Sequence, residues 1–200
     1  MTDGHGSGAA PTKELQRGDQ VGQYEVVGLL GEGGMGTVYE AVQPLIGKRV
    51  AVKVLRPDLA AHPEMVERFV QEARAANQAR SRHIVDIFAF GQLDDGSHYF
   101  VMEYLDGVPL ADILRRQVRL PLDRGLALVG GVCRGLQAAH GQGIVHRDLK
   151  PDNIYVLADE DDDRVRVKIL DFGIAKFTDG DTRLTRAGLV MGTPAYMSPE

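Results

Sequence analysis

The sequence has few features that would place the protein outside a reducing, aqueous compartment. Its 200 residues include a single cysteine, Cys133, so no intramolecular disulfide can form. No apolar run approaches the length that spans a bilayer, and residues 1–14 lack the apolar core of a signal peptide. These absences predict a cytoplasmic domain without a membrane segment in this chain, and they leave open an anchor beyond residue 200.

A strong positive charge is also missing. The chain has 23 basic and 28 acidic residues, a formal net charge of −5, and no basic stripe along its length. A nucleic-acid-binding surface normally carries such a stripe, so the composition argues against nucleic acid as a partner. With 44% apolar residues, the chain is suited to one globular unit or two small lobes.

Short β-branched runs separated by glycines dominate the first half of the chain. Residues 1–20 have no hydrophobic period and are rich in Gly, Ala, Ser, Thr and charge, which predicts a flexible arm. The runs that follow predict strands at 24–30, 37–42, 49–55, 84–90 and 98–104. A helix is predicted to open at His62-Pro63-Glu64, with proline and acid in its first turn.

Helical spacing dominates the second half. A helix is predicted over 122–140, although Gly130-Gly131 weakens it; its apolar face would consist of Leu122, Leu126, Val129, Cys133, Leu136 and His140. A hairpin is predicted from 154–157 and 165–170. We interpret the acidic run 159–163 between them as a solvated turn, because it lacks the glycine and final glutamate of a calcium loop.

The change in pattern near 104–107 predicts a division into two parts. The β-rich part would be an N-lobe at 21–104, and the helical part would be a second lobe at 105–200. Small ligands commonly bind between two such lobes, so we expect a cleft there.

A glycine-rich segment joins the first two predicted strands, and three phosphate-binding interpretations compete for it. Residues 31–38 read Gly-Glu-Gly-Gly-Met-Gly-Thr-Val, which contains G-x-G-x-x-G. A dinucleotide fingerprint would open a helix after its last glycine, and a P-loop would need lysine where Thr37 stands. A glycine-rich hairpin lying over phosphates fits the strand-like continuation, because glycine lets backbone amides approach closely. An ordinary hairpin turn remains the alternative for this motif alone.

Two charged residues stand where apolar ones are expected. Lys53 interrupts the apolar strand 49–55, on the face shared by Ala51. Glu72 lies on the apolar stripe of the helix that follows. Because a buried charge is costly unless it is paired, the sequence predicts that Lys53 and Glu72 form an ion pair, with the remaining lysine donors turned to phosphate oxygens. Two unrelated solvated charges would be the alternative.

A dense group of ionisable residues follows the helix at 122–140. It reads His146-Arg147-Asp148-Leu149-Lys150-Pro151-Asp152-Asn153, and Asp171-Phe172-Gly173 follows the next strand-like run. Phosphoryl transfer needs a carboxylate to receive a hydroxyl proton, oxygen ligands for Mg²⁺, and cations near the transferring group. The carboxylate would be Asp148, and the Mg²⁺ ligands would be Asn153 and Asp171. The cations would be Lys150 and Lys53. His146 is expected to be a hydrogen-bonded core residue with a structural role.

Taken in order, these motifs resemble the eukaryotic-type protein kinase family, from about residue 24 to the end of the chain. The matching residues are Gly31, Gly33, Gly36, Val50-Ala51-Val52-Lys53, Glu72, His146-Arg147-Asp148, Asn153, Asp171-Phe172-Gly173 and Ser198-Pro199-Glu200. Lys150 and the segment 192–196 resemble the serine/threonine branch, and the composition resembles bacterial members. The resemblance implies an α+β, bilobal fold, with a complete β-rich N-lobe and a partial helical C-lobe.

The resemblance also implies roles for single residues, with ATP and Mg²⁺ as cofactors and proteins bearing Ser or Thr hydroxyls as substrates. Asp148 would be the catalytic base, Lys150 would steady the γ-phosphate, and Asn153 and Asp171 would bind Mg²⁺. Met102 falls at the gatekeeper position, and Tyr155 stands beneath the purine, where the family usually has an aliphatic residue. The expected nucleotide-binding set is Leu30, Gly31, Glu32, Gly33, Gly34, Met35, Gly36, Thr37, Val38, Ala51, Lys53, Glu72, Glu103, Leu105 and Tyr155.

Arg147, directly before the base, resembles the arginine of kinases that are switched on by activation-loop phosphorylation. A phosphothreonine would supply an anion for its guanidinium. Thr178, Thr182 and Thr185 are the candidates, whereas Thr193 is expected to contact the catalytic base and the substrate-binding loop.

Two functional hypotheses follow from the sequence. The first is a catalytic serine/threonine kinase that is complete only in a longer chain, because Glu200 falls inside the motif that closes the activation segment. The second is a non-catalytic module, either a pseudokinase-like nucleotide binder or a regulatory fragment. If later helices of the family's fold are missing, the apolar face of the helix at 122–140 is expected to be partly uncovered.

Overall fold

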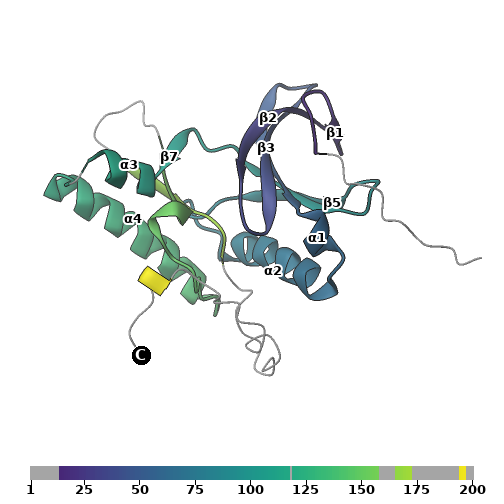
Figure 1. The fold of residues 1–200 in the computed structure, drawn as a ribbon. Coiled ribbons are helices and arrows are strands. Elements are labelled where there is room, and N and C mark those ends of the chain that lie inside the picture. Colours follow the sequence, from purple (N-terminus) through teal and green to yellow (C-terminus); the bar gives the residue numbers. More distant parts are fainter. Residues whose placement is uncertain (1–13, 118, 158–164, 173–193, 197–200) are drawn as a thin grey trace, which may run out of the picture.

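Two lobes of different composition lie side by side, with β1, β2 and β3 in one and α3 and α4 in the other (Figure 1). This computed structural model describes residues 14–117, 119–157, 165–172 and 194–196. The first lobe is an antiparallel sheet with two helices, and the second has two helices and a three-stranded sheet. The arrangement matches the predicted β-rich N-lobe and helical C-lobe.

The N-lobe sheet has six strands in the order β1-β2-β3-β4-β6-β5, and every neighbouring pair is antiparallel. The strands are β1 (Gln20–Val21), β2 (Tyr24–Glu32), β3 (Gly36–Gln43), β4 (Lys48–Leu55), β5 (Ile87–Gln92) and β6 (His98–Glu103). Strands predicted at 24–30, 37–42, 49–55 and 98–104 are therefore confirmed to within two residues at each end.

The alternation of side chains along β4 divides the N-lobe into two apolar cores. Val50 and Val52 pack in an outer cluster with residues of β1, β2 and β3. Ala51 and Leu55 point the other way and pack with Phe69 of the helix below the sheet. This confirms the two predicted faces of the strand. Lys53 shares the inner face and is consequently directed into the protein, where it is 7% exposed.

Helix α2 (Pro63–Ala79) packs against the inner core of the N-lobe. It begins directly after His62, as predicted, with proline and acid in its first turn. Phe69 and Glu72 are buried on the side that meets the sheet, and the Phe69 ring lies 4.8 Å from that of Phe100 in β6. The short helix α1 (Pro57–Ala60) precedes α2 and was not predicted, because four residues are too few to show a helical period.

The C-lobe is built from shorter elements around one long helix. They are β7 (Gly107–Pro109), α3 (Leu110–Arg116), α4 (Leu122–His140), the 3₁₀ turns η1 (Pro151–Asn153) and η4 (Pro194–Tyr196), β8 (Ile154–Leu157) and β9 (Arg166–Ile169). Strands β7, β8 and β9 form an antiparallel sheet in that order. The predicted helix and hairpin are confirmed, whereas β1, β7 and α3 were too short to be recognised from the sequence.

The strand predicted at 84–90 is wrong at its beginning, because β5 starts only at Ile87. Ile84 instead forms an isolated parallel bridge with Ile169 of β9. The Ile169 N–H donates to the His83 carbonyl (2.8 Å), and the Val85 N–H donates to the Ile169 carbonyl (3.1 Å). The C-lobe strand thus satisfies backbone groups that would otherwise pair within the N-lobe sheet. Residues 83–85 connect the two lobes.

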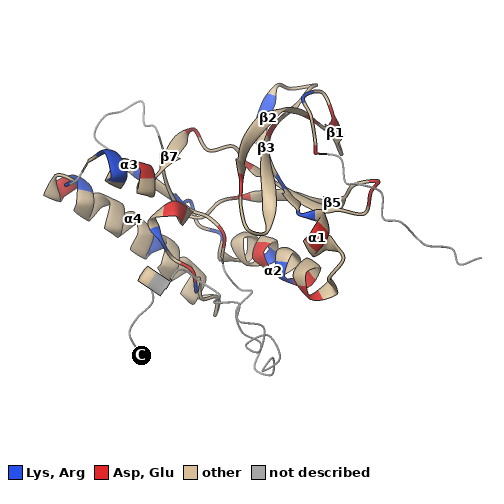
Figure 2. Cartoon of the chain, viewed as in Figure 1, with Lys and Arg blue, Asp and Glu red and all other residues tan. Residues whose placement is uncertain are grey.

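The predicted apolar face of α4 does not point into the C-lobe core. Leu122, Leu126 and Val129 are 78%, 64% and 61% exposed, which confirms the expectation of an uncovered face. Figure 2 shows α4 to be mostly uncharged along its length. The side that is buried carries Leu128, Gly131, Gly135 and Ala139, so small residues allow the helix to approach β9 closely.

Gly131 and Gly125 of α4 allow a matched test of this close approach. A Cβ at Gly131 would stand 2.5 Å from Cγ2 of the buried, stiff Val167, whereas one at Gly125 would meet no heavy atom within 4 Å. We expect Gly131→Ala to lower the free energy of unfolding, because about 1–3 kcal/mol of overpacking exceeds the gain in helix propensity. Gly125→Ala should raise it by up to about 1 kcal/mol. Urea denaturation of both variants measures the difference, and equal effects would contradict the packing of α4.

No helix within the described ranges is both long enough and apolar enough to cross a bilayer.

Candidate active site

Three charged side chains from distant parts of the chain meet at Lys53. Its Nζ donates to Oε1 of Glu72 on α2 (2.7 Å) and to Oδ1 of Asp171 (2.8 Å), which lies 118 residues further along. Lys53 and Glu72 are buried, and the side chain of Asp171 is 47% exposed. The predicted pairing of Lys53 with Glu72 is therefore present. The contact with Asp171 joins the N-lobe to the C-lobe.

One ammonium facing two carboxylates shifts the pKa of all three groups. Burial would lower the pKa of Lys53, but the attraction of Asp171 and Glu72 is larger and raises it above the ordinary value. Burial raises the pKa of Glu72 despite the neighbouring lysine. Burial would likewise raise the pKa of Asp171, but Lys53 lowers it below its usual range. Asp171 is thus the more strongly ionised of the two carboxyls, and Lys53 remains charged.

The loop after α4 brings a second carboxylate close to a second lysine. Lys150 Nζ lies 3.3 Å from Oδ2 of Asp148, and both side chains are 24% exposed. The backbone holds this loop from two directions: the Asp148 N–H donates to His146 Nδ1 (3.3 Å), and Asn153 Nδ2 donates to the Asp148 carbonyl (2.9 Å). Since the NH₂ group of Asn153 donates to this carbonyl, its amide oxygen is the atom of the side chain that could bind a metal.

Two of the three described non-glycine residues with positive φ lie in this region. Arg147 has φ 62° and Asp171 has φ 49°, both in the left-handed region, while the third, Arg80, ends α2. Such backbone conformations are costly for residues other than glycine and gather at functional sites. Their positions, directly before Asp148 and at the contact with Lys53, support the interpretation of these segments as a site.

His146 links the loop that carries Asp148 to the segment that carries Asp171. It is 2% exposed; its Nε2 bonds the Leu170 carbonyl (2.9 Å), and its ring lies 4.7 Å from that of Phe172. Because Nδ1 accepts a bond from the Asp148 N–H, the neutral ring carries its proton on Nε2. The prediction of a structural, hydrogen-bonded core histidine is confirmed.

Stability should depend on pH through His146. Burial lowers its pKa below the ordinary value of about 6.5, so the unfolded chain binds this proton more readily than the folded chain. The associated stability is fully present above about pH 6.5 and is lost as the pH falls towards the folded pKa. We expect His146→Gln to reduce the slope of unfolding free energy against pH below about 6.5. His83, whose pKa burial also lowers, and carboxyls with a lowered pKa such as Asp171 should contribute to the slope that remains. An unchanged slope would contradict a neutral, buried His146.

The glycine segment forms the hairpin between β2 and β3. Glu32 pairs with Thr37 and Gly31 with Val38, and the Gly33 N–H donates to the Gly36 carbonyl (2.8 Å). The chain continues into β3 after Gly36 rather than into a helix, which excludes the dinucleotide fingerprint and leaves the strand-flanked hairpin. At Gly36, a Cβ would collide with the Val54 carbonyl of β4, so glycine allows the loop to lie close to the strand that carries Lys53.

The residues predicted around adenine lie where β6 leaves the N-lobe. Met102 and Ala51 are buried and directly paired between β6 and β4, and Val38 packs on the same inner core. Glu103 ends β6, and Leu105 follows it before β7. Tyr155 is on β8, where it is half-buried and pairs with Pro109 and Lys168. The chain thus brings these residues to the junction of the two lobes.

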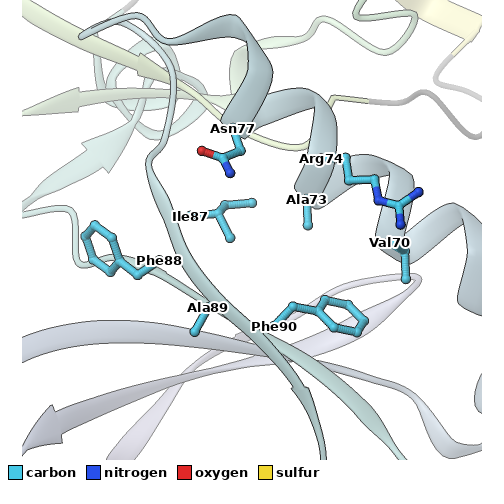
Figure 3. Close-up of a pocket in the computed structure, with 8 residues that line it drawn as sticks. All are labelled: Val70, Ala73, Arg74, Asn77, Ile87, Phe88, Ala89 and Phe90. Atoms are coloured by element: carbon cyan, nitrogen blue, oxygen red, sulfur yellow. The ribbon is translucent and has the colours of Figure 1, made fainter.

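Some predicted residues lie outside the described part of the chain. They are Gly173, Thr178, Thr182, Thr185, Gly192, Thr193, the turn at 159–163 and Ser198-Pro199-Glu200. A cavity of about 340 Å³ is found elsewhere, between α2 and β5, and is lined by Val70, Ala73, Arg74 and Asn77 of α2 and by Ile87, Phe88, Ala89 and Phe90 of β5 (Figure 3). It lies on the edge strand of the sheet, and none of the predicted site residues lines it.

Lys168 was not predicted from the sequence as part of the site. This lysine of β9 is 7% exposed, and its Nζ forms an ion pair with Glu103. The signal that identified Lys53, a lysine inside an apolar strand, was also present at 165–170 but was not used. Glu103 was expected in the nucleotide-binding set, but the ion pair of its side chain with Lys168 was not predicted.

An antiparallel sheet with a buried lysine–glutamate pair lies beside a helical lobe whose loop carries Asp148 and Lys150, and together they have the arrangement of a two-lobed kinase fold. The chain belongs to the protein kinase family, since the family described as protein kinase domain matches residues 24–200.

Relatives and solved structures agree with this membership. Serine/threonine-protein kinase Pkn1 of Myxococcus xanthus is 46% identical over 196 residues, which are 96% of this chain and 27% of that protein. Serine/threonine-protein kinase PknA of Mycobacterium tuberculosis is 41% identical over 183 residues, 90% of this chain and 41% of the relative. The crystal structure of the M. tuberculosis PknI kinase domain superposes with a TM-score of 0.68 at 32% identity, covering 88% of this chain and 68% of that chain.

These likenesses confirm the bilobal fold and the bacterial serine/threonine character of the family to which the chain is similar. The chain spans only 27% and 41% of the length of the two curated relatives.

Proposed function

We propose that this protein is an ATP-dependent serine/threonine protein kinase, which transfers the γ-phosphoryl group of Mg-ATP to Ser or Thr hydroxyls of proteins. The observation that carries the proposal is the junction at Lys53, where Nζ bonds Glu72 of α2 and Asp171 of the C-lobe. Phosphoryl transfer by protein kinases requires a strand lysine paired with a helix glutamate and, beside them, an aspartate that binds Mg²⁺, and Lys53, Glu72 and Asp171 would supply these three groups.

The residues around this junction suit the nucleotide. The β2–β3 hairpin offers backbone amides to phosphates, and Lys53 would bind the α- and β-phosphates while Glu72 holds its orientation. Adenine would meet backbone groups of Glu103 and Leu105, with Ala51 and Val38 above it. Tyr155 would lie below the purine, and the other nucleotide contacts would be those predicted from the sequence.

The donor set also suits magnesium. Mg²⁺ is usually bound by one or two protein ligands together with substrate phosphates rather than by a closed protein cage. Asp171, kept ionised by Lys53, and the amide oxygen of Asn153 are ligands of this kind. No group of three or more His, Cys, Asp or Glu side chains able to hold a metal occurs among the described residues, so these two oxygen donors carry the assignment. When bound, the ion would neutralise charge that develops on the phosphates.

Asp148 and Lys150 would complete the reaction. The Asp148 carboxylate would accept the proton of the substrate hydroxyl as the hydroxyl oxygen attacks the γ-phosphorus. The bond between the γ-phosphorus and the β–γ bridging oxygen would break and release ADP. Lys150, 3.3 Å from Asp148, would stabilise the transferring group. With Lys53, Asp148, Asn153 and Asp171 all present, we do not adopt the non-catalytic alternative.

Regulation by phosphorylation is part of the proposal. Arg147 is exposed beside Asp148, where its guanidinium could bind a phosphothreonine of the activation segment. Thr178, Thr182 and Thr185 are the candidate positions. The single cysteine is consistent with the cytoplasm as the place of action.

The function is tested with purified protein, Mg-ATP labelled at the γ-phosphate and a generic basic protein as acceptor. We expect label in phosphoserine and phosphothreonine, and an increase in thermal stability with Mg-ATP. Stabilisation without incorporation of label would indicate a nucleotide binder instead. If Mg-ATP gives no incorporation and no stabilisation, the kinase and the nucleotide-binder hypotheses are both wrong.

A further inference from the structure

Lys168 is a buried lysine that has no part in the proposed transfer of phosphate. Its side chain is 9% exposed, and Nζ donates to the Ile84 carbonyl (3.0 Å) and to Oε1 of Glu103. Oδ2 of Asp86 lies 3.6 Å away. The three partners come from the segment before β5 and from the end of β6. The side chains of Glu103 and Asp86 are 23% and 63% exposed, so Lys168 is the buried member of the cluster, and a buried ammonium is costly unless it is paired.

Glu103 is held on both its backbone and its side chain. Its N–H donates to the Asp86 carbonyl (2.9 Å), and the Asp86 N–H donates to Oε1 of Glu103 (2.8 Å). The same Oε1 receives the Lys168 ammonium. Oε1 of Glu103 therefore links the end of β6 to the Asp86 backbone and to Lys168 of β9.

The segment that carries Asp86 is itself fixed to the C-lobe. The His83 and Val85 backbones both bond Ile169 of β9, next to Lys168. Lys168 pairs with Tyr155 across β8 and β9, so the two side chains lie on the same face of the small sheet. The cluster thus stands between the C-lobe sheet and the chain that would contact adenine.

We propose that Lys168, Glu103 and Asp86 form a latch that sets the position of the segment from Glu103 to Leu105, at the end of β6, for adenine binding. Lys168 is a positioning residue, since it acts through Glu103 and touches neither phosphate nor acceptor. The latch rests on the proposed function, because it concerns the adenine end of the same nucleotide site. The latch would affect only the adenine end of the nucleotide, while Lys53 and Asp171 would act on its phosphates.

The test compares two ligands in titration calorimetry, Mg-ATP and Mg-tripolyphosphate, the second of which has no adenine. Lys168→Met removes the ammonium and keeps the length of the side chain. It should weaken Mg-ATP binding by about tenfold and leave Mg-tripolyphosphate binding within about twofold. Lys168→Arg keeps the charge and should recover most of the ATP affinity. Lys48→Met, on the exposed end of β4, is the matched control and should change neither ligand.

Hydrogen exchange gives a second readout that needs no nucleotide. Loss of the latch should speed exchange of the Asp86 and Glu103 amides, while the amides of α2 keep their protection. An equal loss of affinity for both ligands, or unchanged affinity with unchanged exchange at these two amides, overturns the latch. If wild-type protein binds neither ligand, the proposed function fails, and exchange alone then decides whether Lys168 fixes the segment.

Discussion

Asp148→Asn is expected to lower kcat for phosphoryl transfer by about 10²–10⁴, the usual contribution of a positioned general base. The amide cannot accept the hydroxyl proton, yet it has nearly the same size as the carboxylate. The bonds that hold the loop use the backbone of residue 148, from its N–H to His146 and from its carbonyl to Asn153, so they survive the change. The affinity for Mg-ATP should therefore stay within about twofold of the wild type.

The matched control is Asp152→Asn, which changes an exposed carboxylate of the same loop four residues away. It removes the same charge from the same region and should leave kcat nearly unchanged. Steady-state kinetics of both variants with labelled ATP, together with calorimetric titration of Mg-ATP, separates binding from transfer. Equal activity of the Asp148 and Asp152 variants would show that residue 148 is not the base.

The central pairing of the site could be predicted from the sequence, because it follows from a local cost. A lysine within an apolar strand and a glutamate on an apolar helix stripe each require a partner, and each supplies the other's need. The structure places Lys53 Nζ 2.7 Å from Glu72. The bond from Lys53 to Asp171, 118 residues further along, was not predicted, because Asp171 was expected to bind Mg²⁺ rather than the lysine.

The packing of α4 could not be predicted in the same way. Hydrophobic spacing placed Leu122, Leu126 and Val129 on one apolar face and led us to expect that face to be partly uncovered, but it gave no sign that the buried side of the helix is a different one, which carries Gly131 and Gly135. A glycine carries no hydrophobic signal, so the sequence presented Gly131 as a weak point of the helix rather than as its closest contact with β9. The start of β5 was also predicted wrongly, because the backbones of His83 and Val85 bond Ile169 in a strand of the other lobe.

The latch shows what a second use of the same rule would have found. Lys168 interrupts an apolar strand as Lys53 does, and the structure gives both lysines two carboxylates. The two clusters lie on either side of Ile169 and Leu170 in the chain, and each joins the C-lobe to the N-lobe. We infer that the relative position of the lobes is fixed by paired charges at two places rather than by apolar contact alone.

Lys53→Met is expected to lower kcat/KM for Mg-ATP by about 10²–10³, because one preorganised cation is removed from the phosphates. Glu72→Gln should have a smaller effect, since Glu72 acts by holding Lys53. The double variant should be no worse than Lys53→Met alone, because Glu72 has nothing left to orient. Additive losses would contradict the dependence of Glu72 on Lys53. Lys48→Met, also on β4 but exposed, serves as the control.

The free energy of unfolding of Lys53→Met should depend on pH, and that of the double variant with Glu72→Gln should not. Without Lys53 the buried Glu72 carboxyl has lost its attraction to the ammonium, so its folded pKa, already raised by burial, rises further above the unfolded value. The folded protein then holds a proton that the unfolded chain releases. Stability is thus retained at low pH and lost as the pH rises from the unfolded pKa towards the folded one.

Lys53→Met should accordingly cost little near pH 6 and up to about 3–5 kcal/mol at alkaline pH, the range for a buried charge left without its partner. Adding Glu72→Gln removes the titrating group and should abolish this pH dependence. Urea denaturation of both variants at pH 6 and at pH 9 measures the difference. A pH-independent cost in Lys53→Met would mean that water, rather than Lys53, stabilises the Glu72 carboxylate in the folded protein.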